Sequence, residues 1–247
     1  MSSILNTERL SISFGGLQAV NDVRFTVEAG QLHAVIGPNG AGKTSLFNLI
    51  TGHLRPTAGR IWFQGQDITG LPQHAVARRG IAKSYQITTV FKNLTVFENL
   101  RVAAQAKKAA FNFWRQADGL PAATERAWQI LEVSGLTGKA NVMAAHLSHG
   151  EQRHLDIGIA LAGDPQLLLL DEPTAGMSPI ETEEAIEFIR ELAQRVSIVL
   201  VEHKMNVVMK ISDRITVMHF GSVLFEGTPE EVRANQKVQD VYLEGLI

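Results

Sequence analysis

Residues 37–44 combine glycines, a lysine and a hydroxyl side chain in the order Gly37-Pro38-Asn39-Gly40-Ala41-Gly42-Lys43-Thr44, and Ser45 follows them. The segment matches the pattern G-x-x-x-x-G-K-[ST] in full. Its glycines let backbone N–H groups turn toward phosphate oxygens, and the N-terminus of a helix attracts the same anion. Lys43 can reach the β- and γ-phosphates of a nucleotide, and the Thr44 hydroxyl can bind Mg²⁺. The segment therefore predicts a binding loop for ATP or a related nucleotide.

A pair of carboxylates, Asp171 and Glu172, follows the apolar run 167–170. In open α/β sheets the carboxyl ends of the strands face the ligand crevice. Asp171 suits a Mg²⁺ ligand, bound directly or through water. Glu172 suits a general base that polarises an attacking water. The pair predicts hydrolysis of the bound nucleotide, whereas two solvated acids at a strand end are the simpler alternative.

The elements that must position these residues follow from hydrophobic periodicity. Alternation predicts strands near residues 10–14 and 23–27, and short apolar runs predict buried strands at 32–36, 167–170 and 197–201. Helical spacing follows the phosphate loop over 44–51, and residues 90–160 are rich in alanine and predicted to be largely helical. Capping residues predict helices that begin at Ser178-Pro179 and Thr228-Pro229. We expect an α/β protein whose parallel-sheet core is split by a helical insert.

The composition excludes several classes of protein. The chain has 247 residues, of which 45% are hydrophobic and 19% charged, and its formal net charge is −2. Such a balance is typical of globular domains and provides no basic field for nucleic acid. There are no cysteines, so disulfides and thiol chemistry are excluded. No apolar run approaches the ~20 residues of a membrane-spanning helix, and the N-terminus has no signal-peptide pattern. We expect a soluble chain.

The segment Leu147-Ser148-His149-Gly150-Glu151-Gln152 resembles the LSGGQ-type signature of ATP-binding cassette (ABC) proteins. The resemblance extends over essentially the whole chain. It implies a P-loop NTPase core of RecA-like type with a mostly parallel sheet, an antiparallel β subdomain and a helical insert subdomain. Residues 1–247 would form a single ABC ATPase domain, with the core at about 1–86 and 161–247 and the helical subdomain at about 87–160. ATP and Mg²⁺ are the implied cofactors.

The resemblance also assigns roles to residues that the pattern alone would leave open. Gln86 resembles the glutamine that contacts Mg²⁺ and water, although a lone glutamine is more often a surface residue. His203, after the apolar run 197–201, resembles the histidine that contacts the γ-phosphate. Phe14 resembles the aromatic residue that stacks on adenine, or is a residue on a sheet face, and Val20 is an added apolar contact. Two residues of the signature, Ser148 and Gly150, would complete the phosphate site of a second subunit.

Three segments resemble the ATPases of branched-chain amino-acid uptake systems, with urea-uptake ATPases as a sibling group. They are Phe14-Gly15-Gly16-Leu17-Gln18-Ala19-Val20, Glu172-Pro173-Thr174-Ala175-Gly176-Met177-Ser178-Pro179 and Val201-Glu202-His203-Lys204-Met205. One departure is that the family's D-loop often reads S-A-L-D, whereas Ala175-Gly176-Met177-Ser178 stands here. The implied function is an ABC importer ATPase that couples ATP hydrolysis to amino-acid uptake. A urea or short-amide importer and a non-transport ABC ATPase are the alternatives.

The resemblance implies several partners and a location. A second ATPase subunit, either a sister chain or a second copy, would form a head-to-tail dimer, and a heterodimer is favoured because such uptake systems usually carry two different ATPases. Two transmembrane permeases, an external binding protein acting indirectly, and no nucleic acid complete the set. The chain would lie on the cytoplasmic face of the inner or plasma membrane as a peripheral subunit. Permease docking or a helix core would explain the apolar residues Phe91, Leu94, Val96 and Leu100, and docking is also suggested for the aromatic residues Phe111, Phe113 and Trp114.

Overall fold

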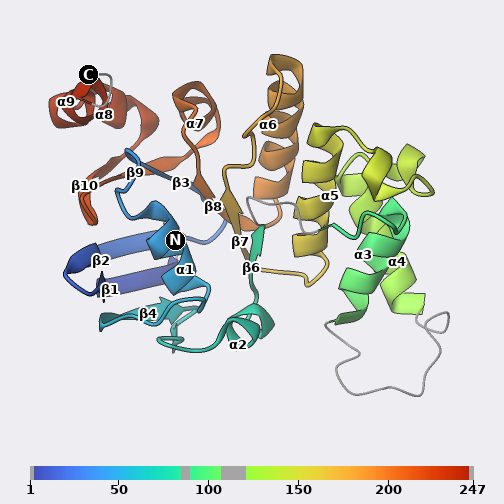
Figure 1. The fold of residues 1–247 in the computed structure, drawn as a ribbon, viewed down its shortest axis with the longest axis horizontal. Coiled ribbons are helices and arrows are strands. Elements are labelled where there is room, and N and C mark those ends of the chain that lie inside the picture. Colours follow the sequence, from blue (N-terminus) through green and yellow to red (C-terminus); the bar gives the residue numbers. More distant parts are fainter. Residues whose placement is uncertain (1–2, 85–89, 107–120, 245–247) are drawn as a thin grey trace. The chain divides into compact units, whose positions relative to one another are not determined.

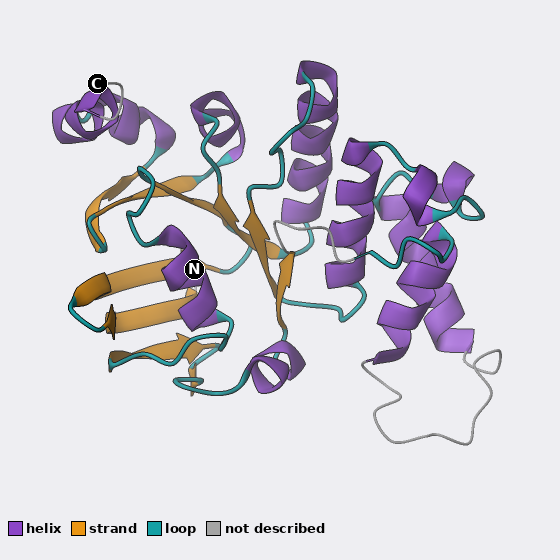
Figure 2. Cartoon of the chain, in the orientation of Figure 1, coloured by secondary structure: helices purple, strands orange, loops and turns teal. Residues whose placement is uncertain are grey.

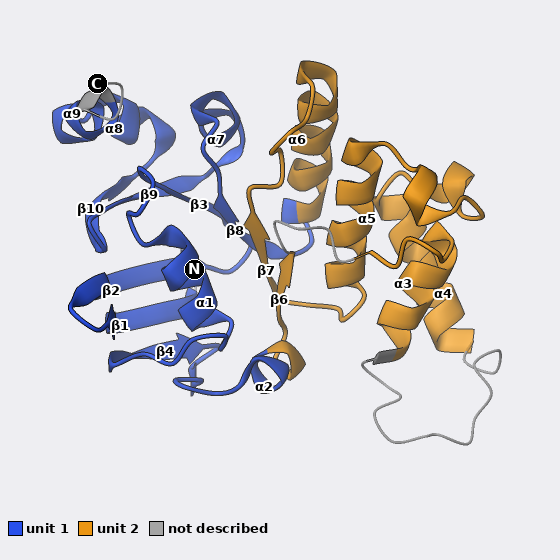
Figure 3. Ribbon diagram, in the orientation of Figure 1, with its two compact units in different colours: residues 1–76, 193–247 blue, residues 77–192 orange. Residues whose placement is uncertain are grey.

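The computed structural model describes residues 3–84, 90–106 and 121–244 (Figure 1). The chain divides into two compact units, residues 1–76 with 193–247 and residues 77–192 (Figure 3). Figure 2 shows that the first unit holds most of the strands, whereas helices dominate the second. The second unit is inserted in the chain between two segments that fold together, which agrees with a core that is interrupted by an insert.

An antiparallel sheet forms one part of the first unit. Its strand order is β2-β1-β4-β5, with β1 at Ser3–Phe14, β2 at Leu17–Glu28, β4 at Ala58–Phe63 and β5 at Gln66–Asp67. Buried residues alternate with exposed ones along much of β1 and β2, as expected when one face of an antiparallel sheet is covered. A turn at residues 15–16 joins β1 to β2.

Parallel strands form the other part of the first unit. The central strand β3 (Leu32–Ile36) pairs in parallel with β8 (Ser197–Val201) and β9 (Arg214–His219). The strand β10 (Ser222–Gly227) then returns antiparallel to β9. All residues of β3 and β8 are buried, which is why they read as continuous apolar runs instead of alternating ones. A tight turn at residues 220–221 joins β9 and β10 into a hairpin.

Four helices of this unit complete its fold, namely α1 (Lys43–Ile50), α7 (Met205–Ile211), α8 (Pro229–Ala234) and α9 (Gln236–Glu244). An apolar cluster joins β3 and β9 to the last three helices through Val208, Val232 and Val238. The helix α8 begins with the predicted capping box, in which Thr228 and Glu231 hydrogen bond reciprocally. The helix α2 (Gln73–Arg78), which contains the boundary between the units, is absent from the sequence prediction.

The second unit contains two parallel strands and four longer helices. The strand β6 (Ile81–Ser84) pairs with β7 (Leu167–Asp171). The helices are α3 (Val96–Ala106), α4 (Pro121–Val133), α5 (His149–Leu161) and α6 (Pro179–Ala193). A second apolar cluster packs α3, α4 and α5 together. The alanine-rich insert is therefore a helical bundle, as predicted, whereas the short strand β6 was not anticipated.

The α/β class and the separate antiparallel sheet are confirmed by these strand pairings. Within the described residues, every helix is too short or too polar to cross a lipid bilayer.

A buried histidine lies on the strand that leads into the phosphate loop. The Nε2 atom of His33 is 2.8 Å from Thr216 Oγ1, and its ring meets Phe25 edge-on at 4.8 Å between centroids. Burial, helped by the positive charge of Arg214, lowers the pKa of His33 to about 3. The imidazole is therefore neutral in the folded protein over the physiological pH range, and it joins β3 to β9 as an uncharged hydrogen-bonding group.

This burial predicts acid sensitivity. Above pH ~6.5 His33 is neutral in both the folded and the unfolded protein. Below that pH only the unfolded chain binds the proton, until the folded-state pKa of about 3 is reached. Its contribution to the free energy of unfolding should fall by about 1.3 kcal/mol between pH 7 and pH 5.5. Urea denaturation at both pH values should show this loss in the wild type and a correspondingly smaller one in His33→Gln. The exposed His53, replaced in the same way, is the control, and equal pH slopes for wild type and His33→Gln would contradict the assignment.

Candidate functional site

The loop between β3 and α1 folds around the ammonium group of Lys43. Its Nζ atom donates hydrogen bonds to the carbonyl oxygens of Gly37 at 2.7 Å and Pro38 at 2.9 Å, and the residue is buried. Lys43 is also the first residue of α1, and Gly42 before it has no side chain to cap the helix. A positive charge and the N-terminus of a helix thus meet within one loop, which is an arrangement that attracts phosphate.

Two glycines of this loop lie too close to neighbouring backbone for any side chain. A Cβ atom on Gly37 would be 2.2 Å from the carbonyl oxygen of Met218, and one on Gly42 would be 2.4 Å from that of Ala19. Both glycines also have positive φ, 149° and 101°. The backbone at Ala41 accepts a hydrogen bond of 3.0 Å from the turn after β9. The strand β2 and the β9–β10 turn therefore fix the shape of the loop.

The predicted adenine contacts, Phe14 and Val20, lie on the β1–β2 hairpin, which borders the phosphate loop at Ala19. Phe14 ends β1 and is 48% exposed, so one face of its ring is available for stacking. Val20 is fully buried and offers no surface to a nucleotide. Val20 therefore packs inside the sheet, and its prediction as an adenine contact is wrong. Phe14 remains the predicted adenine contact.

The turn after β8 presents His203. The preceding side chain, Glu202, is buried and folds back so that its Oε2 atom accepts the backbone N–H groups of His203 at 3.0 Å and Lys204 at 3.3 Å. These hydrogen bonds fix the turn, while the imidazole of His203 lies exposed beyond it. Glu202 is a positioning residue that the sequence analysis missed, although its place between an apolar strand and His203 was a usable signal.

The second unit holds the carboxylate pair at the end of β7. The Asp171 side chain forms a buried ion pair with Lys83 of β6, at 3.2 Å between Nζ and Oδ2. The guanidinium of Arg153, on α5, donates to the backbone carbonyl of Asp171 and lies 3.7 Å from Asp156. Because a buried carboxylate is costly unless it is paired, Lys83 explains how Asp171 can be placed there. Neither cation was identified from the sequence.

Glu172 has a backbone conformation that is uncommon for its residue type. Its φ is +48°, in the left-handed region, where a non-glycine residue is held only when its surroundings impose it. The turn that follows is closed by a hydrogen bond of 3.2 Å from the Ala175 N–H to the Glu172 carbonyl. Glu172 is half-buried. Backbone strain of this kind is concentrated at functional sites. The conformation of Glu172 therefore indicates a functional role independently of the sequence motif.

The signature segment forms the N-terminus of α5. Ser148 is the N-cap, its hydroxyl accepts the Glu151 N–H at 3.3 Å, and Glu151 accepts the Ser148 N–H at 2.9 Å. The backbone N–H of Gly150, which lies between these two residues, donates to Oε1 of Glu181 on α6 at 3.3 Å. At this helix N-terminus Ser148 is therefore exposed and Gly150 is buried, and Gly150 contacts a carboxylate that the sequence analysis did not single out.

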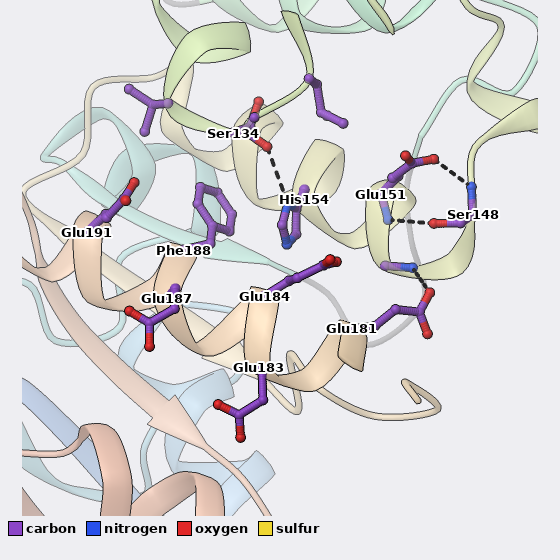
Figure 4. A pocket seen from close by; sticks show the side chains of 14 residues that line it. Ser134, Ser148, Glu151, His154, Glu181, Glu183, Glu184, Glu187, Phe188 and Glu191 are labelled. Atoms are coloured by element: carbon purple, nitrogen blue, oxygen red, sulfur yellow. Dashed lines mark hydrogen bonds between the residues drawn. The ribbon is translucent and has the colours of Figure 1, made fainter. Parts of the chain in front are cut away.

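A groove of about 640 Å³ lies beside this signature segment, between α5, α6 and the turn after α4. Figure 4 shows His154 between the Ser134 carbonyl and the ring of Phe188 on one wall. Carboxylates dominate the lining, which includes Glu151, Glu181, Glu183, Glu184, Glu187 and Glu191. Since these charges would repel a nucleotide, the groove is not a second phosphate site.

The structure places the candidate residues in two sets. The first unit holds Phe14, the loop 37–45 and His203, and the second holds Asp171, Glu172, Ser148 and Gly150. Gln86 and the aromatic residues Phe111, Phe113 and Trp114 lie outside the described residues. Of the suspected docking residues, Val96 and Leu100 are buried in the bundle core, whereas Phe91 is 58% exposed. The reading of these residues as a helix core is therefore correct for Val96 and Leu100.

The described residues include possible oxygen ligands for a divalent cation. Within residues 3–84, 90–106 and 121–244, no three His, Asp or Glu residues cluster as a ready metal site. Thr44 and Asp171 supply a hydroxyl and a carboxylate, which are hard oxygen ligands. Mg²⁺ typically binds one or two such protein groups and completes its shell with water and substrate phosphates. Each of these residues by itself therefore has the chemistry of a Mg²⁺ ligand.

Comparison with known proteins defines the class. Residues 20–175 match the family model described as ABC transporter, and residues 222–243 match the one described as branched-chain amino acid ATP-binding cassette transporter. The chain belongs to the ATP-binding cassette family, and it is an ATPase of that family. The recognition of an ABC protein from its signature and its phosphate loop is confirmed.

Individual relatives show which members of the ABC family this chain resembles. The chain is 43% identical over 249 residues to the branched-chain amino acid transport ATP-binding protein BraF of Pseudomonas aeruginosa, and 42% identical over 250 residues to LivG of Escherichia coli. Each alignment covers 97% of both proteins. Among solved structures, an ATP-binding cassette of an ABC transporter in its ADP conformation superposes with a TM-score of 0.89 at 30% identity, over 98% of this chain and 99% of the other. Nucleotide binding and the ABC ATPase fold follow.

The close packing of Gly42 predicts the effect of a single methyl group. Gly42→Ala places a Cβ 2.4 Å from the Ala19 carbonyl oxygen and keeps a positive φ, so the loop must shift. A shift that costs about 1.4 kcal/mol or more of binding free energy weakens ATP binding at least tenfold. Titration with a fluorescent ATP analogue measures this. Gly16→Ala, where a Cβ meets no atom within 4 Å, is the control, and unaltered affinity in Gly42→Ala would show that the contact does not constrain the loop.

Proposed function

We propose that this chain is the ATP-hydrolysing subunit of an importer for branched-chain or related amino acids. The observation that carries the substrate class is the match of residues 222–243, which form β10 and the C-terminal helices α8 and α9, to the branched-chain family model. The names of the relatives, matched over nearly the full length, support the same class. The ATPase domain extends over residues 1–247, with the core at about 1–86 and 161–247 and the helical subdomain at about 87–160.

The site residues divide the work of hydrolysis. Lys43 binds the β- and γ-phosphates together with the backbone N–H groups of residues 37–45. Thr44, Gln86 and Asp171 would bind Mg²⁺, and the ion would neutralise charge on the phosphates. Glu172 accepts a proton from the attacking water, and His203 contacts the γ-phosphate. Phe14 stacks on the adenine ring.

A second ATPase subunit completes the site. Ser148 and Gly150, at the N-terminus of α5, meet the γ-phosphate of the ATP held by the partner, so that two nucleotides are enclosed in a head-to-tail dimer. A sister chain is the favoured partner, because uptake systems of this kind carry two different ATPases. ATP closes the dimer and hydrolysis opens it.

Two permease subunits receive this motion at the cytoplasmic face of the membrane, and an external binding protein delivers the solute to them. Phe91 is suited to the contact because buried Asn99 holds its backbone in place, accepting from the Phe91 N–H at 2.8 Å and donating to its carbonyl at 3.0 Å. A rigidly held, exposed aromatic side chain is typical of a binding anchor.

Replacing the proposed base separates hydrolysis from binding. Glu172→Gln keeps the size of the side chain but cannot accept a proton, so turnover should fall at least 100-fold while ATP still binds. Measurement of phosphate release alongside nucleotide titration tests this, with Glu191→Gln, an exposed glutamate on α6, as the control. Hydrolysis near the wild-type rate in Glu172→Gln would remove the role assigned to this carboxylate.

Uptake of labelled leucine and labelled urea by the parent organism tests the substrate class. Lys43→Ala removes the ammonium that holds the phosphate loop, so it should abolish leucine uptake and leave urea uptake intact. Loss of urea uptake alone would assign the chain to a urea or short-amide importer with the same mechanism. Retention of both would refute the amino-acid and urea assignments, and absence of the chain from membranes that contain its permeases would favour a non-transport ABC ATPase.

A further inference from the structure

One carboxylate, that of Glu181, joins two separate helix N-termini in the second unit. Its Oε2 atom accepts the Ser178 N–H at 3.0 Å, and the Glu181 N–H donates to the Ser178 hydroxyl at 3.3 Å, which together cap α6. Its Oε1 atom accepts the N–H of Gly150 on α5 at 3.3 Å. Figure 4 shows this side chain reaching from the first turn of α6 to the signature. A single side chain therefore connects the signature to the loop that follows Glu172.

A second contact joins the same two segments. His149, the residue that replaces a glycine in the family signature, lies over Gly176, where a Cβ would be 3.3 Å from the imidazole Cε1 atom. Gly176 belongs to the loop 175–178, which lacks the aspartate that the family often carries there. A displacement of the signature relative to α6 would therefore alter the contacts of Glu181 and His149 with this loop.

Glu181 also has the charge needed to compete with a phosphate. Hydrogen bonds from the Ser178 N–H and hydroxyl and from the Gly150 N–H hold the pKa of Glu181 below its usual range, so it is ionised at neutral pH. The Gly150 amide is one of the donors that a helix N-terminus leaves without an intrahelical partner. An anion that approaches this amide meets both an occupied donor and a like charge.

We propose that Glu181 is a positioning residue that occupies the Gly150 amide until the γ-phosphate of the partner's ATP displaces it. The displacement releases the carboxylate on the α6 side, and the loop 172–178 then senses that the opposite nucleotide has arrived. This inference rests on the proposed function, since it needs the signature to face a nucleotide of a second subunit. The loop 175–178 lacks the aspartate that the family often carries there. We assign to Glu181 part of the coupling between the two nucleotide sites that this aspartate would otherwise provide.

The test uses the assembled complex of the full chain with its permeases in lipid vesicles, in which the rate of hydrolysis is measured against ATP concentration. Glu181→Gln keeps the length of the side chain and its acceptor oxygen but removes the competing charge. Two unit charges about 5 Å apart, in an effective dielectric close to that of water, repel each other enough to change affinity about fourfold. We expect KM for ATP to fall about fourfold without a rise in kcat, because the closed dimer forms more readily while release of the loop is weakened.

The control is Glu191→Gln, which removes a carboxylate from the same groove and the same helix, about three turns beyond Glu181, but makes none of these contacts. It should leave KM and kcat unchanged. The Gly150 amide resonance of the ¹⁵N-labelled chain gives a second readout, which should move in Glu181→Gln and not in Glu191→Gln. An unchanged or raised KM in Glu181→Gln would reduce Glu181 to a helix cap and overturn the inference alone. Hydrolysis that survives Lys43→Ala would instead overturn the proposed function, and with it this inference.

Discussion

Backbone N–H groups at helix N-termini are the donors on which this structure depends. Each α-helix leaves its first amides without intrahelical partners, and the chain treats them differently at each helix. At α8 and at α5 a capping box satisfies two of these N–H groups with side chains, and at α5 Glu181 also accepts the N–H of Gly150. At α1 a glycine precedes the helix and contributes no capping side chain. The helix that follows the phosphate loop is therefore the one whose donors are best suited to a phosphate.

The loop before α1 keeps its shape because the neighbouring backbone leaves no space for another loop conformation. Backbone oxygens of β2 and β9 lie where side chains on Gly42 and Gly37 would be, and a hydrogen bond from the turn after β9 reaches the Ala41 carbonyl. Most of the first unit can be understood as support for this loop. The buried His33 on β3 belongs to the same support, because its neutral ring links the strand that precedes the loop to β9.

In the second unit, the comparable constraint is the cost of burying charge. Asp171 is placed at the end of an apolar strand only because Lys83 pairs with it from β6. Arg153 then ties α5 to the same strand end through the Asp171 carbonyl. The signature helix and the catalytic strand are thereby held in one framework, and Glu181 adds a link to the next helix. The apolar cluster that packs α3, α4 and α5 and these ionic and hydrogen-bonded contacts together set the positions of the candidate residues here.

The sequence by itself determined the class of the fold and most of the candidate site. Local rules were sufficient for the phosphate loop, for the buried strands and for the capped helices, because their signals lie in adjacent residues. The strand β6 was missed because four residues with a lysine among them carry too little periodicity. The helix α2 was missed for the same reason, since it has only six residues.

Tertiary structure alone decided the partners of the site residues. The pairs Lys83 with Asp171 and Gly150 with Glu181 join positions that are 88 and 31 residues apart in the chain, as their numbering gives (171 − 83 and 181 − 150). No local pattern specifies such pairs, because they depend on which elements pack together. The burial of Val20 has the same origin: its apolar side chain fits either a nucleotide or a core, and only the packing of β2 selects the core.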